Sequence, residues 1–202
     1  MNIGIYSGSF DPIHTGHAVL ANYIAGSGLV DEVWILVTPH NPIKSHEAVA
    51  SDADRMAMAR IVANRSEGVR ASDFELRLPR PTYSYRTLRA LAEAYPEHNF
   101  RIIVGADNYA TFDRWRDADL IRREFGLIVY PRPGAEIDTG SLHPNVSYAA
   151  DAPRVEISST MVRALLAEGR NANFFVPCPV ADYIRDRGLY APGASSISSN
   201  TL

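Results

Sequence analysis

A short segment that begins at Gly8 and ends at His17 combines two glycines, two histidines and several hydroxyl groups. Gly8 lets the backbone turn sharply, and Gly16 lets a ligand approach the start of a helix. Thr15 is a residue type that caps helix N-termini, and the free backbone N–H groups at such an end attract phosphate. Since His14 and His17 are three residues apart, both can face one ligand. The segment therefore predicts a phosphate-binding turn.

Other interpretations of this segment start from the same residues. It is not a P-loop, because no Gly-Lys-Ser/Thr follows, and it lacks the G-x-G-x-x-G pattern of dinucleotide-binding turns. Two histidines are also zinc ligands, although no third ligand is apparent and the spacing differs from H-E-x-x-H. Both histidines could instead cap and fill a turn. From residue chemistry alone, a phosphate site, structural histidines and a metal site stay open.

A second pattern of the same kind lies late in the chain, at residues 157–163. Ser158 is a good N-cap, two more hydroxyl residues follow it, and Arg163 comes one turn later. The pattern is that of an ordinary capped helix, but it also brings helix N–H groups, hydroxyls and a guanidinium group together, which suits phosphate oxygens. Two such sites in one domain indicate a triphosphate held between helix ends.

Apolar runs and helical patterns alternate along the chain and would position these two segments. The predicted strands cover 2–7, 33–38, 100–104 and 126–130. The predicted helices cover 16–27, 51–64, 82–95, 116–124, a segment that Ser158 opens and Gly169 ends, and 179–187. This alternation predicts an α/β fold with a doubly wound, mostly parallel sheet. Ligands of such sheets bind beyond the carboxyl ends of the strands.

The domain organisation follows from composition along the chain. The loop 131–153 is rich in proline and glycine and is predicted to be irregular. Residues 191–202 are small and polar, which is typical of a disordered tail. We therefore predict a single domain at 1–190, followed by that tail.

The overall composition excludes several classes of protein. The 202 residues are 46% hydrophobic and 21% charged, which is ordinary globular composition rather than that of a disordered chain, collagen or coiled coil. A net charge of -3 argues against a dedicated nucleic-acid binder. The single cysteine, Cys178, argues against a disulfide scaffold. With no signal-peptide pattern and no long apolar run, we expect a cytoplasmic protein with no membrane association.

The two chemical segments resemble the signatures of a known superfamily. Residues 8–17 are similar to the G-[ST]-F-D-P-x-H-x-G-H signature of the HxGH nucleotidyltransferases, and residues 157–163 are similar to their second signature. Within that superfamily, the middle of the chain resembles nicotinate-nucleotide adenylyltransferases. Residues 82–88 are similar to the S-Y-T-x-x-T-L segment of that family, 105–115 to G-A-D-x-x-x-x-F-x-x-W, and 130–134 to the R-P-G loop.

The resemblance implies a Rossmann-like fold and the transfer of AMP from ATP to nicotinate mononucleotide, a step of NAD biosynthesis. It implies that His14, His17, Lys44 and Arg163 act on the phosphates. The residues that it places against ATP are Gly8, Ser9, Phe10, Gly16, Gly105, Asp107, Ile157, Ser158, Ser159 and Thr160. Those that it places against the mononucleotide are Tyr83, Ser84, Trp115 and Arg132.

Two departures from the family pattern concern these residues. The family commonly has P-P-H-[KR] after the second strand, whereas this chain has the displaced cation Lys44, which could equally be a solvated surface lysine. Ser84 stands where the family usually has threonine. Two further residues have a structural alternative, since Asp107 could cap a helix and Trp115 could close a core.

The resemblance also implies the ligands. Mg²⁺ is expected to be held mainly by substrate phosphates and water, so no metal site of the protein itself is predicted. The expected partners are ATP and nicotinate mononucleotide, without nucleic acid, and a homo-oligomer is compatible with the sequence. The alternatives are a phosphopantetheine adenylyltransferase, against which Trp115 and the Tyr83–Ser84 pair argue, and a non-catalytic nucleotide-binding module, against which His14 and His17 argue.

Overall fold

The structure is a computed structural model that describes residues 1–39 and 50–192. Its centre is one six-stranded sheet in which all neighbouring strands are parallel. The strands are β1 (Asn2–Gly8), β2 (Glu32–Val37), β3 (Val69–Ser72), β4 (Asn99–Gly105), β5 (Leu127–Tyr130) and β6 (Val146–Tyr148). Their order across the sheet is β3-β2-β1-β4-β5-β6, which is the order of Rossmann-type sheets. The predicted fold class is therefore confirmed.

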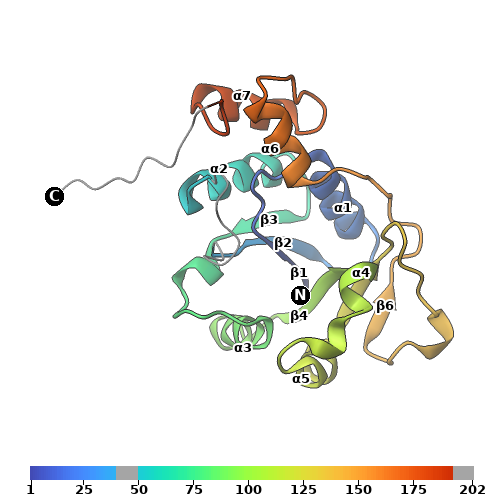
Figure 1. Cartoon of the computed structure of the whole chain (residues 1–202). Helices are drawn as coiled ribbons and strands as arrows, with labels where there is room; N and C mark the ends of the chain where they lie inside the picture. Colours follow the sequence, from blue (N-terminus) through green and yellow to red (C-terminus); the bar gives the residue numbers. More distant parts are fainter. Residues whose placement is uncertain (40–49, 193–202) are drawn as a thin grey trace.

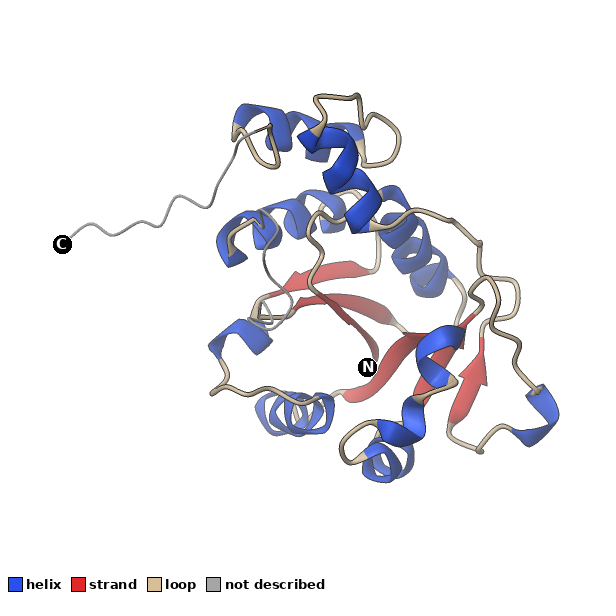
Figure 2. Ribbon diagram, viewed as in Figure 1, coloured by secondary structure: helices blue, strands red, loops and turns tan. Residues whose placement is uncertain are grey.

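Helices cover both faces of the sheet (Figures 1 and 2). One side carries α1 (Thr15–Gly26) and α2 (Asp52–Ala63), with α6 (Ser159–Ala167) and α7 (Cys178–Asp186) outside them. The other carries α3 (Ser84–Ala94) and α5 (Ala118–Glu124). The short helical segments are η2 (Phe74–Arg77), α4 (Ala106–Tyr109), η3 (Phe112–Arg114) and η4 (Thr139–Ser141).

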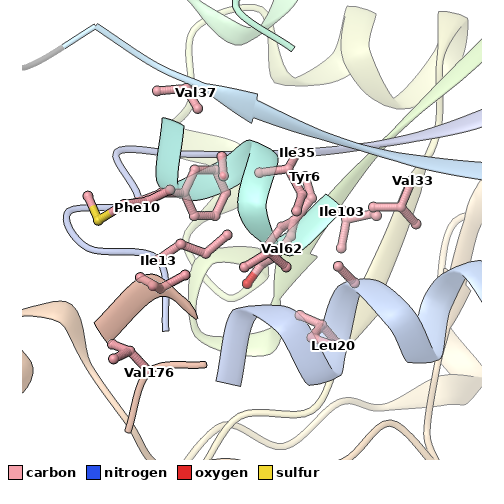
Figure 3. Packing of buried hydrophobic residues seen from close by; sticks show 14 of the residues in the cluster. Tyr6, Phe10, Ile13, Leu20, Val33, Ile35, Val37, Val62, Ile103 and Val176 are labelled. Atoms are coloured by element: carbon pink, nitrogen blue, oxygen red, sulfur yellow. The ribbon is translucent and has the colours of Figure 1, made fainter. Parts of the chain in front are cut away.

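Two apolar clusters hold these layers together. Successive side chains of a strand point to opposite faces, so Val33 and Ile35 of β2 join one cluster while Trp34 joins the other. Figure 3 shows the first cluster, where Leu20 of α1 and Val62 of α2 pack against residues of the sheet. Because the central strands are buried on both faces, their sequences read as continuous apolar runs.

The helix boundaries follow local signals in the sequence. Asp54 donates its backbone N–H to Ser51 Oγ (3.1 Å), and Met161 donates to Ser158 Oγ (3.1 Å), so both serines cap their helices. Gly169 follows the end of α6 with a φ of 67°, a left-handed conformation that suits glycine. The predictions made for the ends of these two helices are confirmed.

Two strands and the chain end differ from the expectations. β3 was not predicted, and β6 lies inside the segment 131–153 that was expected to be irregular. Most of the predicted tail, and the predicted phosphate contact Lys44, lie outside the described residues. The boundary at residue 190 stays a prediction. In the described ranges, every helix is too short or too polar to cross a membrane.

Candidate active site

The winding of the sheet reverses between β1 and β4. The helices that follow β1 and β2 lie on one face, whereas α3 and α5, on either side of β4 in the chain, lie on the other. The loops after β1 and β4 therefore leave the sheet in opposite directions and open a crevice at its carboxyl edge. The first signature follows β1, and Gly105 ends β4. The topology thus places both segments at the usual ligand position of this fold.

A cavity of about 210 Å³ lies at this edge. Its lining comes from Tyr6 in β1, the N-terminal part of α1, residues 130–133 at the end of β5 and just after it, and most of residues 153–159 before and at the start of α6. The two signatures, far apart in sequence, therefore share one cavity. The N-terminal ends of α1 and α6 both contribute to it, and free N–H groups at such ends favour an anion.

The two histidines cap α1 reciprocally. The backbone N–H of His17 donates to His14 Nδ1 (3.3 Å), and the backbone N–H of His14 donates to His17 Nδ1 (3.2 Å). Their rings stack with centroids 3.5 Å apart. The prediction that Thr15 is the N-cap is wrong, because the imidazole groups satisfy the end of the helix and Thr15 Oγ1 donates to the carbonyl of Phe174 instead (2.8 Å).

These hydrogen bonds fix the protonation of the rings. A nitrogen that accepts an N–H carries no proton of its own, so each ring is the neutral tautomer with its proton on Nε2. Burial, and secondly the charge of Arg132, lower the pKa of His14 to about 4. Burial, followed by His14 and Arg132, lowers the pKa of His17 well below its ordinary value. The site therefore offers two neutral N–H donors at pH 7.

The lowered pKa of His14 predicts a pH dependence of stability. The unfolded chain binds a proton near pH 6.5 and the folded chain only near pH 4, so stability is present above pH 6.5 and is lost as the pH falls toward 4. Denaturant unfolding between pH 7 and 4 should show a loss on the order of 3 kcal/mol from this group. His14→Asn, which keeps an N-cap acceptor without a titrating ring, should show a shallower decline. If the free energy of unfolding declines equally with pH in the two proteins, His14 is not the group whose protonation destabilises the fold.

Gly8, Phe10 and Gly16 shape the first signature from within. The Phe10 ring, 2% exposed, lies 3.2–3.4 Å from where a Cβ of Gly8 would stand, and it packs edge-on against His17 with centroids 5.0 Å apart. A Cβ on Gly16 would lie 3.1 Å from His14 Nδ1. The expectation that Gly16 makes room for a ligand is therefore incomplete, since the glycine first makes room for His14. Phe10 supports the His17 ring from the buried side.

Arg55 supports the turn after β1 through hydrogen bonds from its buried side chain. This role was not predicted from the sequence. Its side chain is fully buried, and Nη1 donates to the carbonyl of Ser9 and to that of Thr38 (2.9 Å). Nη2 pairs with Asp52. A signal was present, because Arg55 precedes Met58 and Val62 by three and seven residues and so lies on the buried face of its helix.

Residues of the second signature also hold this turn. Ser159 Oγ donates to the carbonyl of Pro12 (2.9 Å), and Arg163 Nη1 donates to that of Asp11 (2.8 Å). The Asp11 carboxylate accepts from the Ala50 N–H (3.1 Å) and the Tyr190 hydroxyl. The turn is therefore tied to α2, to α6 and to the C-terminal segment. Thr160 Oγ1, also in the second signature, accepts a hydrogen bond from Arg163 Nη2 (3.4 Å). Ile157 lines the cavity.

Gly105, Asp107 and Arg132 meet at the end of β4. A Cβ on Gly105 would lie 2.4 Å from Asp107 Oδ1 and 2.8 Å from Arg132 Cγ, so this position requires glycine. Gly105, not Asp107, is the N-cap of α4, and Asp107 lies 3.7 Å from Arg132 Nε in a half-exposed ion pair. Arg132 lines the cavity together with both histidines. The structure thus brings it to the predicted phosphate contacts.

Tyr83, Ser84 and Trp115 lie outside the lining of that cavity. Tyr83 is the N-cap of α3 but makes no side-chain cap, and Ser84 is the first helical residue. The Arg116 guanidinium lies 4.6 Å from the centre of the Tyr83 ring, so the segment around Trp115 lies beside the start of α3. Trp115 is half-buried and packs against Phe112. Part of the residue stays exposed to solvent.

Comparisons with known proteins agree with this architecture. Residues 5–165 match the model of the cytidylyltransferase-like family. A protein of Bacteroides fragilis named "probable nicotinate-nucleotide adenylyltransferase" is 46% identical over 173 residues, which is 86% of each chain. One of the same name from Bacteroides thetaiotaomicron is 41% identical over 92% of each chain.

A solved structure agrees as well. Nicotinic acid mononucleotide adenylyltransferase of Plasmodium falciparum, complexed with NaAD, matches 94% of this chain and 97% of its own with a TM-score of 0.76. At 24% identity this match establishes the common fold. Together with the family model and the two close relatives, it means that the chain belongs to the cytidylyltransferase-like family and to the nicotinate-nucleotide adenylyltransferases.

Proposed function

We propose that this protein transfers AMP from ATP to nicotinate mononucleotide and so makes nicotinate adenine dinucleotide, a step of NAD biosynthesis. A phosphate oxygen of the mononucleotide attacks the α-phosphorus of ATP, and the bond from that phosphorus to the β-phosphate oxygen breaks, releasing pyrophosphate. The observation that carries the proposal is the shared cavity, which receives two neutral N–H donors from the first signature and one helix N-terminus from each signature. The names of the close relatives support the same reaction.

The chemistry needs positioning rather than a protein nucleophile, because the acceptor phosphate is itself the nucleophile. His14 and His17 would donate Nε2–H to phosphate oxygens around the reacting phosphorus, where charge increases in the transition state. Arg132 would face the same phosphates and adds a permanent positive charge. Arg163, whose Nη1 donates to the Asp11 carbonyl, would add a positive charge close to the turn and so favour the phosphates.

The metal ion would enter with the nucleotide. In the described ranges, the side chains of His, Cys, Asp and Glu nowhere gather into a group of three or more that could hold a metal ion. Mg²⁺ bound to ATP needs no such cage, because phosphates and water supply most of its ligands. We therefore treat Mg·ATP as the substrate. Oligomeric state and cytoplasmic location stay predictions of the sequence.

The acceptor would lie beside the start of α3. Because Tyr83 makes no side-chain cap, backbone N–H groups at this helix end can receive the carboxylate of the nicotinate ring. The open part of the Trp115 ring would stack on the pyridine. Arg86 and Arg116, 5.8 and 4.6 Å from the centre of the Tyr83 ring, add positive charge nearby. These groups favour nicotinate mononucleotide, which carries a carboxylate, over nicotinamide mononucleotide, which carries a neutral amide.

Pyrophosphate release from Mg·ATP tests the reaction and the acceptor together. We expect release only when nicotinate mononucleotide is added, and a preference of roughly 10–100-fold over nicotinamide mononucleotide, since an unpaired buried polar group costs about 1–3 kcal/mol. Phosphopantetheine should be inactive. Rapid hydrolysis of ATP without an acceptor would exclude a transferase, and absence of any turnover would favour a binding module. Preference for nicotinamide mononucleotide or for phosphopantetheine would contradict the assignment of nicotinate mononucleotide as the acceptor, while the transfer of AMP from ATP would still stand.

A further inference from the structure

Glu75 is a buried acidic side chain that the mechanism above leaves without a role. It lies in η2, between β3 and α3, and is 8% exposed. Burial raises the pKa of this carboxyl group above its ordinary value, and the described residues provide it with no ion pair. A carboxyl group in such a place costs stability unless its surroundings compensate for it. The contacts of Glu75 therefore indicate what its carboxyl group does.

The partners of Glu75 are two threonines on either side of the start of α3. Thr82 Oγ1 donates to Glu75 Oε1 at 2.8 Å. The Thr87 hydroxyl, 2% exposed, also lowers the pKa of Glu75, although it makes no hydrogen bond of standard geometry within the described ranges. Thr82 comes two residues before α3 begins, and Thr87 lies one turn inside it. The carboxyl group thus bridges η2 and the entry of this helix through Thr82, with Thr87 of the first turn close to it.

This bridge holds a segment with few other attachments. Among the described residues, the bond from Thr82 to Glu75 is the one side-chain hydrogen bond that anchors residues 78–83. Arg80 adds an exposed ion pair with Asp52 at 3.5 Å, which is weak. Because Glu75 accepts from the Thr82 hydroxyl rather than from a backbone amide, it fixes the path of the chain into α3 while leaving the N–H groups at the helix start free for a ligand.

We infer that Glu75 is a positioning residue for the acceptor: through its hydrogen bond with Thr82, its carboxyl group sets the helix start that receives the nicotinate carboxylate. The inference rests on the proposed function. It assigns Glu75 a role in binding the mononucleotide, not ATP, because the cavity that holds the phosphates has no residue of η2 in its lining. Loss of Glu75 should therefore raise the KM for the mononucleotide without raising the KM for ATP.

Steady-state kinetics of variants, alongside thermal unfolding, test this role. Glu75→Leu should raise KM for nicotinate mononucleotide about 10-fold, the range expected for a lost hydrogen-bonded bridge, and leave KM for ATP and kcat within about twofold. Its melting temperature should be unchanged or higher, because an apolar side chain of similar volume often replaces a buried charged group without loss. Glu75→Gln, which keeps an acceptor for Thr82, should restore KM to within about threefold.

Further variants decide between the alternatives. Thr82→Val should raise the same KM, and the double variant with Glu75→Leu should do no more than either change alone, since both break one contact. Asp54→Leu is the matched control: it removes a carboxylate, 7% exposed, that binds Tyr183 and Arg187 far from α3. It should lower the melting temperature and leave the ratio of the two KM values unchanged.

Two results would overturn the inference. One is a Glu75→Leu protein with a normal KM for the mononucleotide. The other is a less stable protein in which both KM values rise together, as a purely structural residue would produce. The variant Trp115→Ala distinguishes a failure of the role assigned to Glu75 from a failure of the proposed acceptor site. If it raises the KM for the mononucleotide and Glu75→Leu does not, the acceptor site stands and the role of Glu75 falls. If neither variant does, the acceptor site is misplaced and the inference falls with it.

Discussion

Replacement of His17 by alanine should lower kcat by about 10²–10³, with much smaller changes in either KM. His17 offers a neutral Nε2–H because its Nδ1 accepts the backbone N–H of His14, and Phe10 and Tyr6 hold its ring edge-on from the buried side. A donor fixed in this way costs no reorganisation when charge increases on the transferred phosphoryl group. Its loss should therefore appear in the chemical step. Single-turnover measurement of AMP transfer would record this step directly.

A matched variant controls for the hydrogen bond from the His14 backbone N–H to His17 Nδ1, which His17→Ala also removes. His143 accepts the backbone N–H of Asn145 through its own Nδ1 (3.2 Å) but lies outside the cavity lining. His143→Ala loses a bond of the same kind and should keep the wild-type kcat. Circular dichroism should show both variants folded. A folded His17→Ala protein that retains more than about a third of kcat would show that this ring does not act on the developing charge.

Arg55→Met should both destabilise the protein and nearly abolish turnover. The change leaves the carbonyls of Ser9 and Thr38 without their buried donor, and each such loss costs about 1–3 kcal/mol. We expect a decrease of roughly 2–4 kcal/mol in the free energy of unfolding, measured by urea denaturation. The turn that carries His14 would also lose its support, and a displacement of about 1 Å can cost about 10²-fold in rate.

Arg60→Met provides the comparison, because Arg60 lies on the exposed face of the same helix. It should stay within about 0.5 kcal/mol of wild type and keep full activity. Below the unfolding range of denaturant, the Arg55→Met protein should still bind ATP weakly, since both helix N-termini remain. Wild-type stability and kcat in Arg55→Met would show that the buried guanidinium does not support the turn.

The features that the sequence predicted are those with a local cause. Ser51 and Ser158 begin their helices because a short side-chain oxygen reaches the backbone N–H three residues on, which depends on little else. The central strands were predictable because burial on both faces demands a run of apolar residues. The convergence of the two signatures also followed from the alternating pattern, since the carboxyl ends of parallel strands share one edge.

The features that the sequence did not predict are decided by contacts between distant segments. β3 and β6 are short edge strands with polar residues, and their neighbours rather than their own side chains make them strands. His14 displaced Thr15 as the cap because a second histidine completes a pair of bonds. The bonds from Arg55 to the carbonyls of Ser9 and Thr38 form only when α2 packs against the turn, and Arg132 reaches the histidine cavity only because β5 lies beside β4.

The hydroxyl of Tyr190 donates to the carboxylate of Asp11, 179 residues earlier in the chain. Ser159 and Arg163 add their bonds to the same turn from residues that are also made late. During translation β1 and its turn leave the ribosome before all of these partners, so the turn acquires its full set of attachments only after residue 190 has emerged. The nascent chain therefore cannot hold the turn that carries His14 with its full set of native bonds until translation has passed residue 190.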